Sequence, residues 1–126
     1  MNEKIDILMA TYNGEKYIRA QIESILAQTY SNFNLIICDD CSSDNTFTIL
    51  KEYEKKDERV KLFRNNENLG VISNFEKLLG FVKSDYFMYA DQDDVWLENK
   101  VELSYKHLIT TNSYLVFTDL IVVDEN

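Results

Sequence analysis

The 126-residue chain contains no proline and only three glycines, so its turns must be made mainly by Asn, Asp and Ser. It has two cysteines, Cys38 and Cys41, in a C-x-x-C arrangement of the kind used in redox and zinc sites. One such pair cannot form a four-ligand zinc site alone, and the single histidine, His107, lies far along the chain. We therefore expect Cys38 to fill space at the end of a strand.

Basic residues are scarce as well. The 13 Lys and Arg residues stand against 22 Asp and Glu, which gives a formal net charge of −9. This balance argues against nucleic acid as a partner, because binding to phosphate backbones needs a basic face. It does not argue against a nucleotide ligand, since a metal ion can bridge carboxylates to a diphosphate.

Long apolar segments are also missing from the sequence. None approaches the roughly eighteen residues of a membrane-spanning helix. The first residues, Met1 to Lys4, lack the basic-then-apolar pattern of a signal peptide. We therefore expect a cytoplasmic protein.

The chain does contain a regular alternation of apolar strands and amphipathic helices over a single domain, residues 1–126. Strands are expected at residues 5–10, 33–38, 60–63, 86–90 and 114–118, with residues 121–123 trailing behind. Helices are expected at residues 15–28, after the capping residues 42–45, at 72–82 and at 98–110. This order predicts an α/β fold with a Rossmann-like, open, mostly parallel sheet and helices on both faces.

Polar residues collect directly after three of the predicted strands. The first strand ends in Thr11-Tyr12-Asn13-Gly14, the second in Asp39-Asp40, and the fourth in Asp91-Gln92-Asp93-Asp94. Ligands of open α/β sheets bind outside the carboxyl ends of the strands. If the strands are parallel, the three clusters share one edge of the sheet, and this shared location favours a binding site over three unrelated loops.

The acidic run after the fourth strand carries three carboxylates in four residues, at positions 91, 93 and 94. Carboxylates this close repel one another, so a site that keeps them ionised usually supplies a cation. Oxygen ligands suit Mg²⁺ or Mn²⁺ rather than zinc. Taken alone, the run fits a solvated acidic turn better than a metal site, and only the other clusters favour a metal that holds a diphosphate.

The first two clusters offer groups that suit a nucleoside. Thr11 can supply a hydroxyl and Tyr12 a flat ring to a base, although Thr11 fits simple helix-entry chemistry equally well. Asp40 can accept a hydrogen bond from a ribose or from a base N–H. Asp39 is the candidate for capping the local backbone and orienting the loop.

These elements together resemble the inverting glycosyltransferases of family 2, which have the GT-A fold. The matching segments are Ala10-Thr11-Tyr12-Asn13, Gln28-Thr29-Tyr30, Cys38 to Thr46, Asn66 to Gly70, and Asp91-Gln92-Asp93-Asp94. The resemblance spans essentially the whole chain in the right order. The continuation into Val95-Trp96 is similar to the subgroup that includes bacterial rhamnosyltransferases of surface polysaccharide synthesis.

The resemblance implies a role for each candidate residue. Contacts to the nucleotide of a UDP- or dTDP-sugar donor are implied for Thr11, Tyr12, Asn13, Asp40 and Asp91. Asp91 and Asp93 would form the D-x-D element that binds Mn²⁺ or Mg²⁺, with Asp93 as the direct ligand, and Asp94 would orient the sugar or the residues around the metal. The acceptor would be a saccharide or a lipid-linked saccharide, with peripheral membrane association at the inner face.

The catalytic base is the part of the family pattern that the chain lacks. The family places it well downstream of the D-x-D, which here means beyond Asn126. Asp119 and Asp124 match a segment that precedes the acceptor region, so neither is assigned as the base. We expect the donor-binding half of a larger enzyme, which binds nucleotide but transfers sugar weakly or not at all.

Two other functions use similar carboxylates. A haloacid-dehalogenase-type phosphatase has a D-x-D loop and Mg²⁺, but that loop normally follows the first strand rather than the fourth. A receiver-like signalling domain also clusters Asp residues at strand ends, but it needs a lysine after the last strand, and none is present there. Turnover of p-nitrophenyl phosphate would favour the phosphatase, and phosphorylation by acetyl phosphate would favour the receiver.

Overall fold

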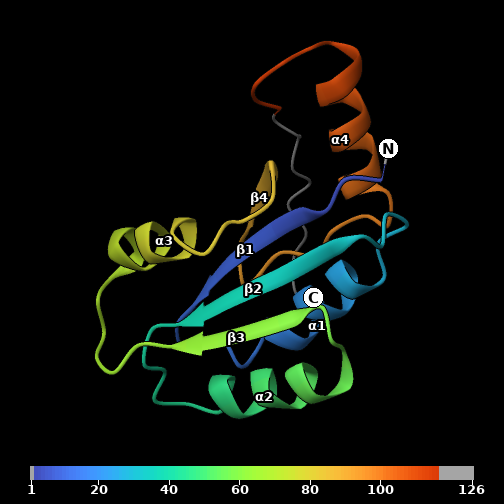
Figure 1. Ribbon diagram of the computed structural model, residues 1–126. Coiled ribbons are helices and arrows are strands. Elements are labelled where there is room, and N and C mark those ends of the chain that lie inside the picture. The colour runs from blue at the N-terminus through green and yellow to red at the C-terminus, as the bar shows by residue number, and fades with distance from the viewer. Residues whose placement is uncertain (1, 117–126) are drawn as a thin grey trace.

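The protein is described here by a computed structural model that covers residues 2–116. Four parallel strands form one sheet in the order β3-β2-β1-β4 (Figure 1). The strands are β1 (Ile5–Thr11), β2 (Phe33–Asp39), β3 (Val60–Arg64) and β4 (Tyr86–Ala90). The helices are α1 (Ile18–Leu26), α2 (Thr46–Lys56), α3 (Val71–Leu79) and α4 (Lys100–Thr110).

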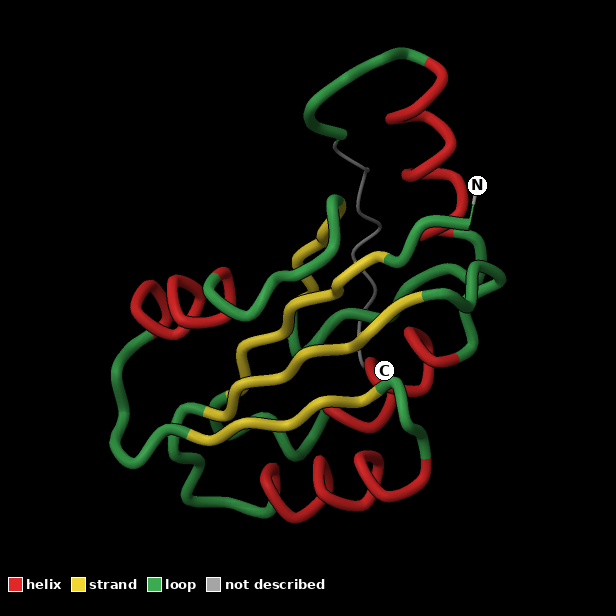
Figure 2. Tube along the Cα trace, in the orientation of Figure 1, coloured by secondary structure: helices red, strands yellow, loops and turns green. Residues whose placement is uncertain are grey.

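Strand β1 is central and pairs with neighbours on both sides. It runs beside β2 from Ile5↔Phe33 to Thr11↔Asp39, and beside β4 from Ile5 to the Met9↔Ala90 pair. The chain adds β2 and β3 on one side of β1 and then crosses back to add β4 on the other. Ligand crevices form at such a reversal, outside the carboxyl ends of the strands. The loops that follow β2 and β3 lie together at that end of the sheet (Figure 2).

Helices cover both faces of the sheet, as predicted. On one face, β1 residues such as Ile7 and Met9 pack with side chains from α1, α2 and α4 in the larger apolar cluster. On the other face, Leu8 and Ile36 pack with Leu78 of α3. Cys38 is fully buried in this second cluster, which confirms that it fills space, and its burial raises the pKa of the thiol. In the part of the chain described, no helix is long and apolar enough to cross a membrane.

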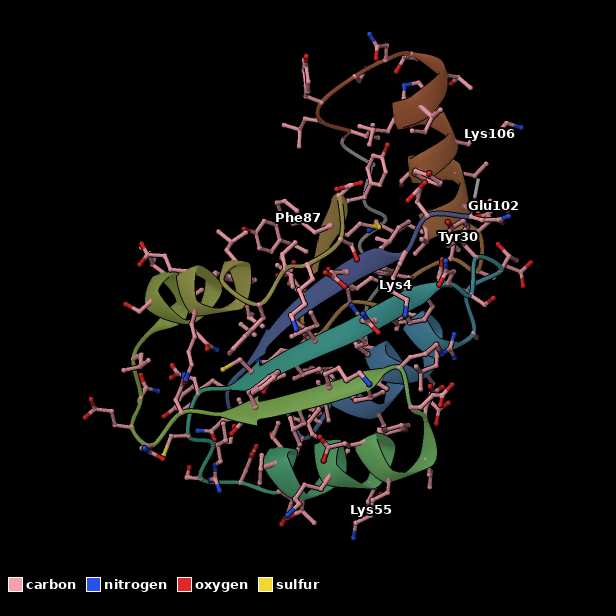
Figure 3. The ribbon with its side chains drawn as sticks, viewed as in Figure 1. Lys4, Tyr30, Lys55, Phe87, Glu102 and Lys106 are labelled. Carbon is pink, nitrogen blue, oxygen red and sulfur yellow. The ribbon has the colours of Figure 1, made fainter. Side chains whose placement is uncertain are left out.

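Helix α4 is fastened to the rest of the domain by the segment that follows α1. The amide of Gln28 donates to the Leu97 carbonyl oxygen at 2.7 Å and accepts from the Val101 N–H at 2.9 Å. Tyr30 packs edge-to-face on Tyr105 of α4 at 5.5 Å between ring centroids, and Figure 3 shows Tyr30 near the base of this helix. These contacts hold α4, the helix that follows the acidic run, against the segment that follows α1.

Several element boundaries differ from the predicted ones. Helix α1 begins at Ile18 rather than residue 15, because the Gly14 carbonyl oxygen accepts from the N–H groups of Tyr17 and Ile18 in a preceding turn. Helix α3 ends at Leu79 instead of residue 82, with Gly80 as its C-cap, and α4 begins at Lys100 instead of 98.

The predicted strand 114–118 is wrong for residues 114–116, which are bend and coil, with Tyr114 fully exposed. A strand needs a neighbour for its backbone hydrogen bonds, and residues 114–116 pair with none of the four described strands. Residues 117–118, the trailing segment 121–123, Asp119 and Asp124 lie outside the described residues.

Asp6, a buried carboxylate in β1, gives a test of the fold away from the site. It accepts hydrogen bonds from the N–H groups of Lys83 and Ser84 at 2.9 and 3.0 Å and from the Asn34 amide at 3.1 Å. Burial alone would raise the pKa of Asp6, but these three donors lower it below 3.8. We expect Asp6→Ala to lower the free energy of unfolding by about 2 kcal/mol at pH 7, measured by urea denaturation.

The lowered pKa of Asp6 also fixes the direction of its pH dependence. Its contribution is present above pH 3.8 and is lost as the pH falls through the lower folded-state pKa. The stability difference between wild type and Asp6→Ala should therefore shrink on acidification below pH 3.8. A difference that stays constant down to pH 2 would contradict this assignment.

Candidate functional site

A pocket of about 200 Å³ lies at the carboxyl ends of the central strands. Its walls come from the ends of β1, β2 and β4 and from the first turns of α3. The lining residues are Ala10, Thr11, Tyr12, Asp40, Val71, Asn74, Phe75, Asp91, Gln92 and Asp93. The predicted convergence of three polar clusters is therefore confirmed, and this pocket is the candidate site.

A larger cavity of about 360 Å³ lies elsewhere, between β4, α4 and residues 114–116. Aromatic and aliphatic side chains make up most of its wall, and it contains none of the carboxylates that follow the strands. The smaller pocket is the better candidate for two reasons. The carboxylates line it, and it lies at the carboxyl ends of β1, β2 and β4, where the strand order reverses.

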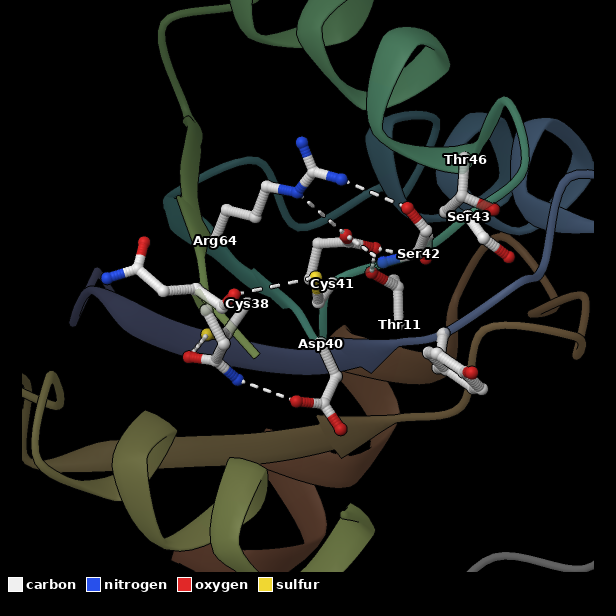
Figure 4. A network of polar contacts seen from close by, with 12 residues as sticks. Thr11, Cys38, Asp40, Cys41, Ser42, Ser43, Thr46 and Arg64 are labelled. Carbon is white, nitrogen blue, oxygen red and sulfur yellow. Dashed lines mark hydrogen bonds and ion pairs between the residues drawn. The ribbon is translucent and has the colours of Figure 1, made fainter. Parts of the chain in front are cut away.

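Asp39 is the centre of the loop that follows β2. Its carboxylate accepts from the Thr11 hydroxyl at 2.7 Å and from the hydroxyl and N–H of Ser42 at 2.6 and 2.9 Å. Arg64 lies 3.7 Å away and donates to the Ser42 carbonyl oxygen; Figure 4 shows Arg64, Ser42 and Thr11 around this carboxylate. The prediction that Asp39 caps the local backbone and orients the loop is confirmed.

Thr11 is consequently turned toward the protein rather than toward solvent. Only 1% of the residue is exposed, and its hydroxyl proton is donated to Asp39. The sequence suggested that the Thr11 hydroxyl could contact a base. Because its proton is donated to Asp39, the hydroxyl oxygen could only accept a hydrogen bond from a base. Thr11 nevertheless forms part of the pocket wall.

Asp40 faces the opposite way and reaches into the pocket. One carboxylate oxygen accepts from the Leu69 N–H at 2.8 Å and from the Asn65 amide at 2.9 Å, a contact drawn in Figure 4. The other oxygen accepts from the Gly70 N–H at 2.9 Å. Burial alone would raise the pKa of Asp40, but these donors, together with the Lys77 charge, lower it below 3.8. The carboxylate is ionised at neutral pH and retains acceptor capacity for a ligand.

Two buried amides support Asp40 from the α3 side, and the sequence did not indicate either as a site residue. Asn65 is hydrogen-bonded to Asn74 at 3.0 Å, and Asn74 donates to the Cys38 carbonyl oxygen at 2.9 Å. The Lys77 ammonium donates to the Asn65 side-chain oxygen at 2.7 Å. The only available signal was the single asparagine on the apolar side of a helical segment, at position 74.

Tyr12 and Asn13 follow β1 but have different positions. Tyr12 is 45% exposed at the pocket, so its ring is available to a flat ligand. Asn13 adopts a left-handed backbone, with φ of 46°, and its side-chain oxygen accepts from the Ser43 N–H at 2.9 Å. Asn13 thus joins the β1 and β2 loops and does not line the pocket, although the sequence grouped it with the nucleotide contacts.

Two of the three carboxylates of the acidic run, Asp91 and Asp93, line the pocket, whereas Asp94 lies outside its wall. Partial burial, Asp94 and Asp93 all raise the pKa of Asp91, and the nearby Lys100 opposes them. A divalent cation relieves this kind of repulsion. Within residues 2–116, no three ligating side chains are grouped closely enough to hold a metal by themselves.

Two glutamines, which the sequence did not single out, fix the backbone of the acidic run. The buried Gln21 of α1 donates to the Asp91 carbonyl oxygen at 2.6 Å. The Gln92 amide pairs with the backbone of Tyr12, accepting from its N–H at 2.9 Å and donating to its carbonyl oxygen at 3.0 Å. The acidic run therefore has a defined position relative to the end of β1.

Comparison with known proteins gives a consistent result. Residues 6–126 match the family described as Glycosyl transferase family 2. A relative from Escherichia coli, named UDP-Glc:alpha-D-GlcNAc-diphosphoundecaprenol beta-1,3-glucosyltransferase WfgD, is 34% identical over 123 residues. This match covers 97% of the present chain and 47% of the relative, so the chain spans about half the length of that protein.

Solved structures give the same fold. S. aureus TarS 1-349 in complex with UDP superposes with a TM-score of 0.78 at 24% identity, over 86% of this chain and 33% of that one. The mannosyltransferase PcManGT from Pyrobaculum calidifontis, in complex with GDP-Man and Mn²⁺, gives 0.79 at 18% identity, over 86% and 33%. At these identities the likeness concerns the fold, and it confirms the α/β GT-A architecture.

Proposed function

Because the chain belongs to glycosyl transferase family 2, we propose that residues 2–116 form the donor-binding part of a glycosyltransferase. The donor is a sugar carried on a nucleoside diphosphate, and the pocket at the ends of β1, β2 and β4 receives it. One observation carries the proposal: three carboxylates line the same pocket. Asp40 is ionised and already accepts hydrogen bonds from the protein, whereas Asp91 and Asp93 repel each other.

The nucleoside end of the donor binds between Tyr12 and Asp40. Three donors already contact the Asp40 carboxylate, and the oxygen bonded to Gly70 retains a lone pair for a base N–H or a ribose hydroxyl. Uracil and thymine both present a ring N–H, so UDP- and dTDP-sugars suit this acceptor. The exposed ring of Tyr12 offers a face for stacking.

The diphosphate binds beside the acidic run with Mn²⁺ or Mg²⁺. Such ions often use one or two carboxylates and complete their shell with substrate phosphates and water, which fits a site without three grouped protein ligands. Asp91 and Asp93 would hold the ion, with Asp93 as the direct ligand, and Asp94 would orient the residues around it. When bound, the ion stabilises negative charge on the departing diphosphate.

The chemistry of sugar transfer is the one that membership of the family implies. An acceptor hydroxyl forms a bond to the anomeric carbon as the bond from that carbon to the diphosphate breaks, with inversion, and the hydroxyl proton passes to a base. None of the described side chains in the pocket is assigned as that base. We propose a saccharide or lipid-linked acceptor in surface polysaccharide synthesis, with the protein at the cytoplasmic face of the membrane. WfgD is named for a diphosphoundecaprenol substrate, which supports this choice.

Calorimetric titration with UDP and with dTDP, each with Mn²⁺ and with EDTA, tests the proposal directly. We expect binding in Mn²⁺ that weakens strongly in EDTA, since Asp91 and Asp93 would hold an ion that neutralises the diphosphate charge. The better of the two nucleotides identifies the base. No binding under any condition, or turnover of p-nitrophenyl phosphate in its place, would overturn the proposal.

A further inference from the structure

Gln92 is the middle residue of the acidic run and forms an unusual contact. Its side-chain amide meets the backbone of Tyr12 with both groups, at 2.9 Å to the N–H and 3.0 Å from the carbonyl oxygen. The backbone pairing of β1 with β4 stops at Met9↔Ala90. The Gln92 side chain thus continues the connection between these strands beyond the last backbone pair.

The space for this amide depends on Gly14. A Cβ atom at position 14 would lie 2.4 Å from the Gln92 Oε1 atom and 2.7 Å from its Cδ atom, both too short for any non-bonded contact. Gly14 is not among the residues with positive φ, so its backbone does not itself require glycine. The absence of a side chain at Gly14 therefore leaves room for the Gln92 amide in its observed position.

The contact joins two parts of the pocket that recognise different parts of a donor. Tyr12, Asp91 and Asp93 all line the pocket. In the proposed function Tyr12 faces the base, whereas Asp91 and Asp93, which flank Gln92, face the diphosphate and metal. Gln21 fixes the Asp91 carbonyl oxygen from α1, so the acidic run is held on a second side. The hydrogen-bonding groups of the Gln92 amide that face Tyr12 are both occupied by the Tyr12 backbone.

We propose that Gln92 is a positioning residue that sets the separation between the nucleoside subsite and the diphosphate–metal subsite, an inference that rests on the proposed function. A ligand that engages two subsites gains affinity only when their spacing matches its own length. Loss of the Gln92–Tyr12 pair should weaken ligands that span both subsites and spare ligands that use one. In this chain, glutamine at the middle position of the D-x-D element thus has a geometric role.

Gln92→Met tests the inference, because methionine keeps the length of glutamine but cannot form either hydrogen bond. We expect affinity for UDP with Mn²⁺, measured by calorimetry, to fall about tenfold, the order expected for two hydrogen bonds. Affinity for uridine without metal, followed by NMR, should stay within about twofold of wild type. A merely structural role would weaken both ligands equally, and either that outcome or unchanged UDP affinity would overturn the inference.

A double-mutant cycle with Gly14 supplies the second test. Gly14→Ala should weaken UDP binding about tenfold, because the new Cβ displaces the Gln92 amide. In the Gln92→Ala background the same change should have no further effect, since the space is then open. Additive losses would show that the two positions act independently and would overturn the inference.

The two proposals fail in different ways. A wild-type chain that binds no UDP overturns the proposed function, and with it the role of Gln92 in donor binding. If the wild type binds UDP and Gln92→Met binds it with the same affinity, only the inference about Gln92 is overturned. Thermal unfolding of each variant shows whether it is folded, and the half-buried Gln92 lies outside both apolar clusters.

Discussion

Replacing Asp40 with alanine is expected to lower the free energy of unfolding by about 3 kcal/mol and to abolish nucleotide binding. The change leaves the N–H groups of Leu69 and Gly70 and the Asn65 amide without their acceptor. Buried donors that lose a charged partner are costly because water cannot fully replace it. Urea denaturation at pH 7 and calorimetry with UDP and Mn²⁺ measure the two effects.

Asp57→Ala is the matched control for Asp40→Ala. Asp57 also accepts a hydrogen bond from a backbone N–H and pairs with a cationic side chain, Arg59. Its side chain is 22% exposed, and it does not line the pocket. We expect a smaller loss of stability and unchanged UDP affinity. Because the pKa of Asp40 is lowered, its contribution exists above pH 3.8 and disappears as the pH falls through the folded-state pKa. Equal stability losses in the two variants would contradict the central role of Asp40.

Asp93→Asn is expected to remove the metal dependence of UDP binding and to lower affinity in Mn²⁺ at least about a hundredfold. Among the described residues, two carboxylates line the side of the pocket proposed for the metal, so loss of one halves these charged ligands for the ion. The residual affinity should equal that of wild type in EDTA. Asp85→Asn, which makes the same charge change in an exposed residue just before β4, should leave binding unchanged.

Asp91→Asn should separate ligand binding from stability. Its pKa is raised by burial and by Asp94 and Asp93, so the ionised form is disfavoured in the folded, metal-free protein. The stability that Asp91 contributes is present below pH 3.8 and is lost as the pH rises through the folded-state pKa. In EDTA at pH 7 we therefore expect Asp91→Asn to be slightly more stable than wild type, yet weaker in UDP binding. A less stable variant would contradict the repulsion among these carboxylates.

The sequence predicted the sheet well because apolar periodicity is a local property. All four strands of the sheet and all four helices occur where periodicity placed them, with helix ends shifted by up to three residues. Glu15, the expected first helical residue, lies in the turn before α1, where its side chain accepts a hydrogen bond from the Asn45 N–H at 3.2 Å. This contact spans 30 positions, so the local apolar pattern could not indicate it.

The carboxylates of the site were predictable, but their supporting residues were not. Asp39, Asp40, Asp91 and Asp93 stand out as charges directly after apolar strands. Gln92, Gln21 and Asn74 have no such local signal, because their partners lie 80, 70 and 36 positions away. Their importance follows from the strand order, which brings β4 beside β1.

Strand order also sets the sequence of events when the protein is made. The networks around Asp39 and Asp40 are complete once residue Lys77 has been added, whereas Gln92 meets Tyr12 across 80 positions. At about 5–20 residues per second, on the order of 4–16 s separate the synthesis of these two partners. Until β4 is added, β1 presents an open edge to other strands. The proposed nucleotide donor would therefore stabilise only the finished sheet, since the pocket needs residues that follow β4.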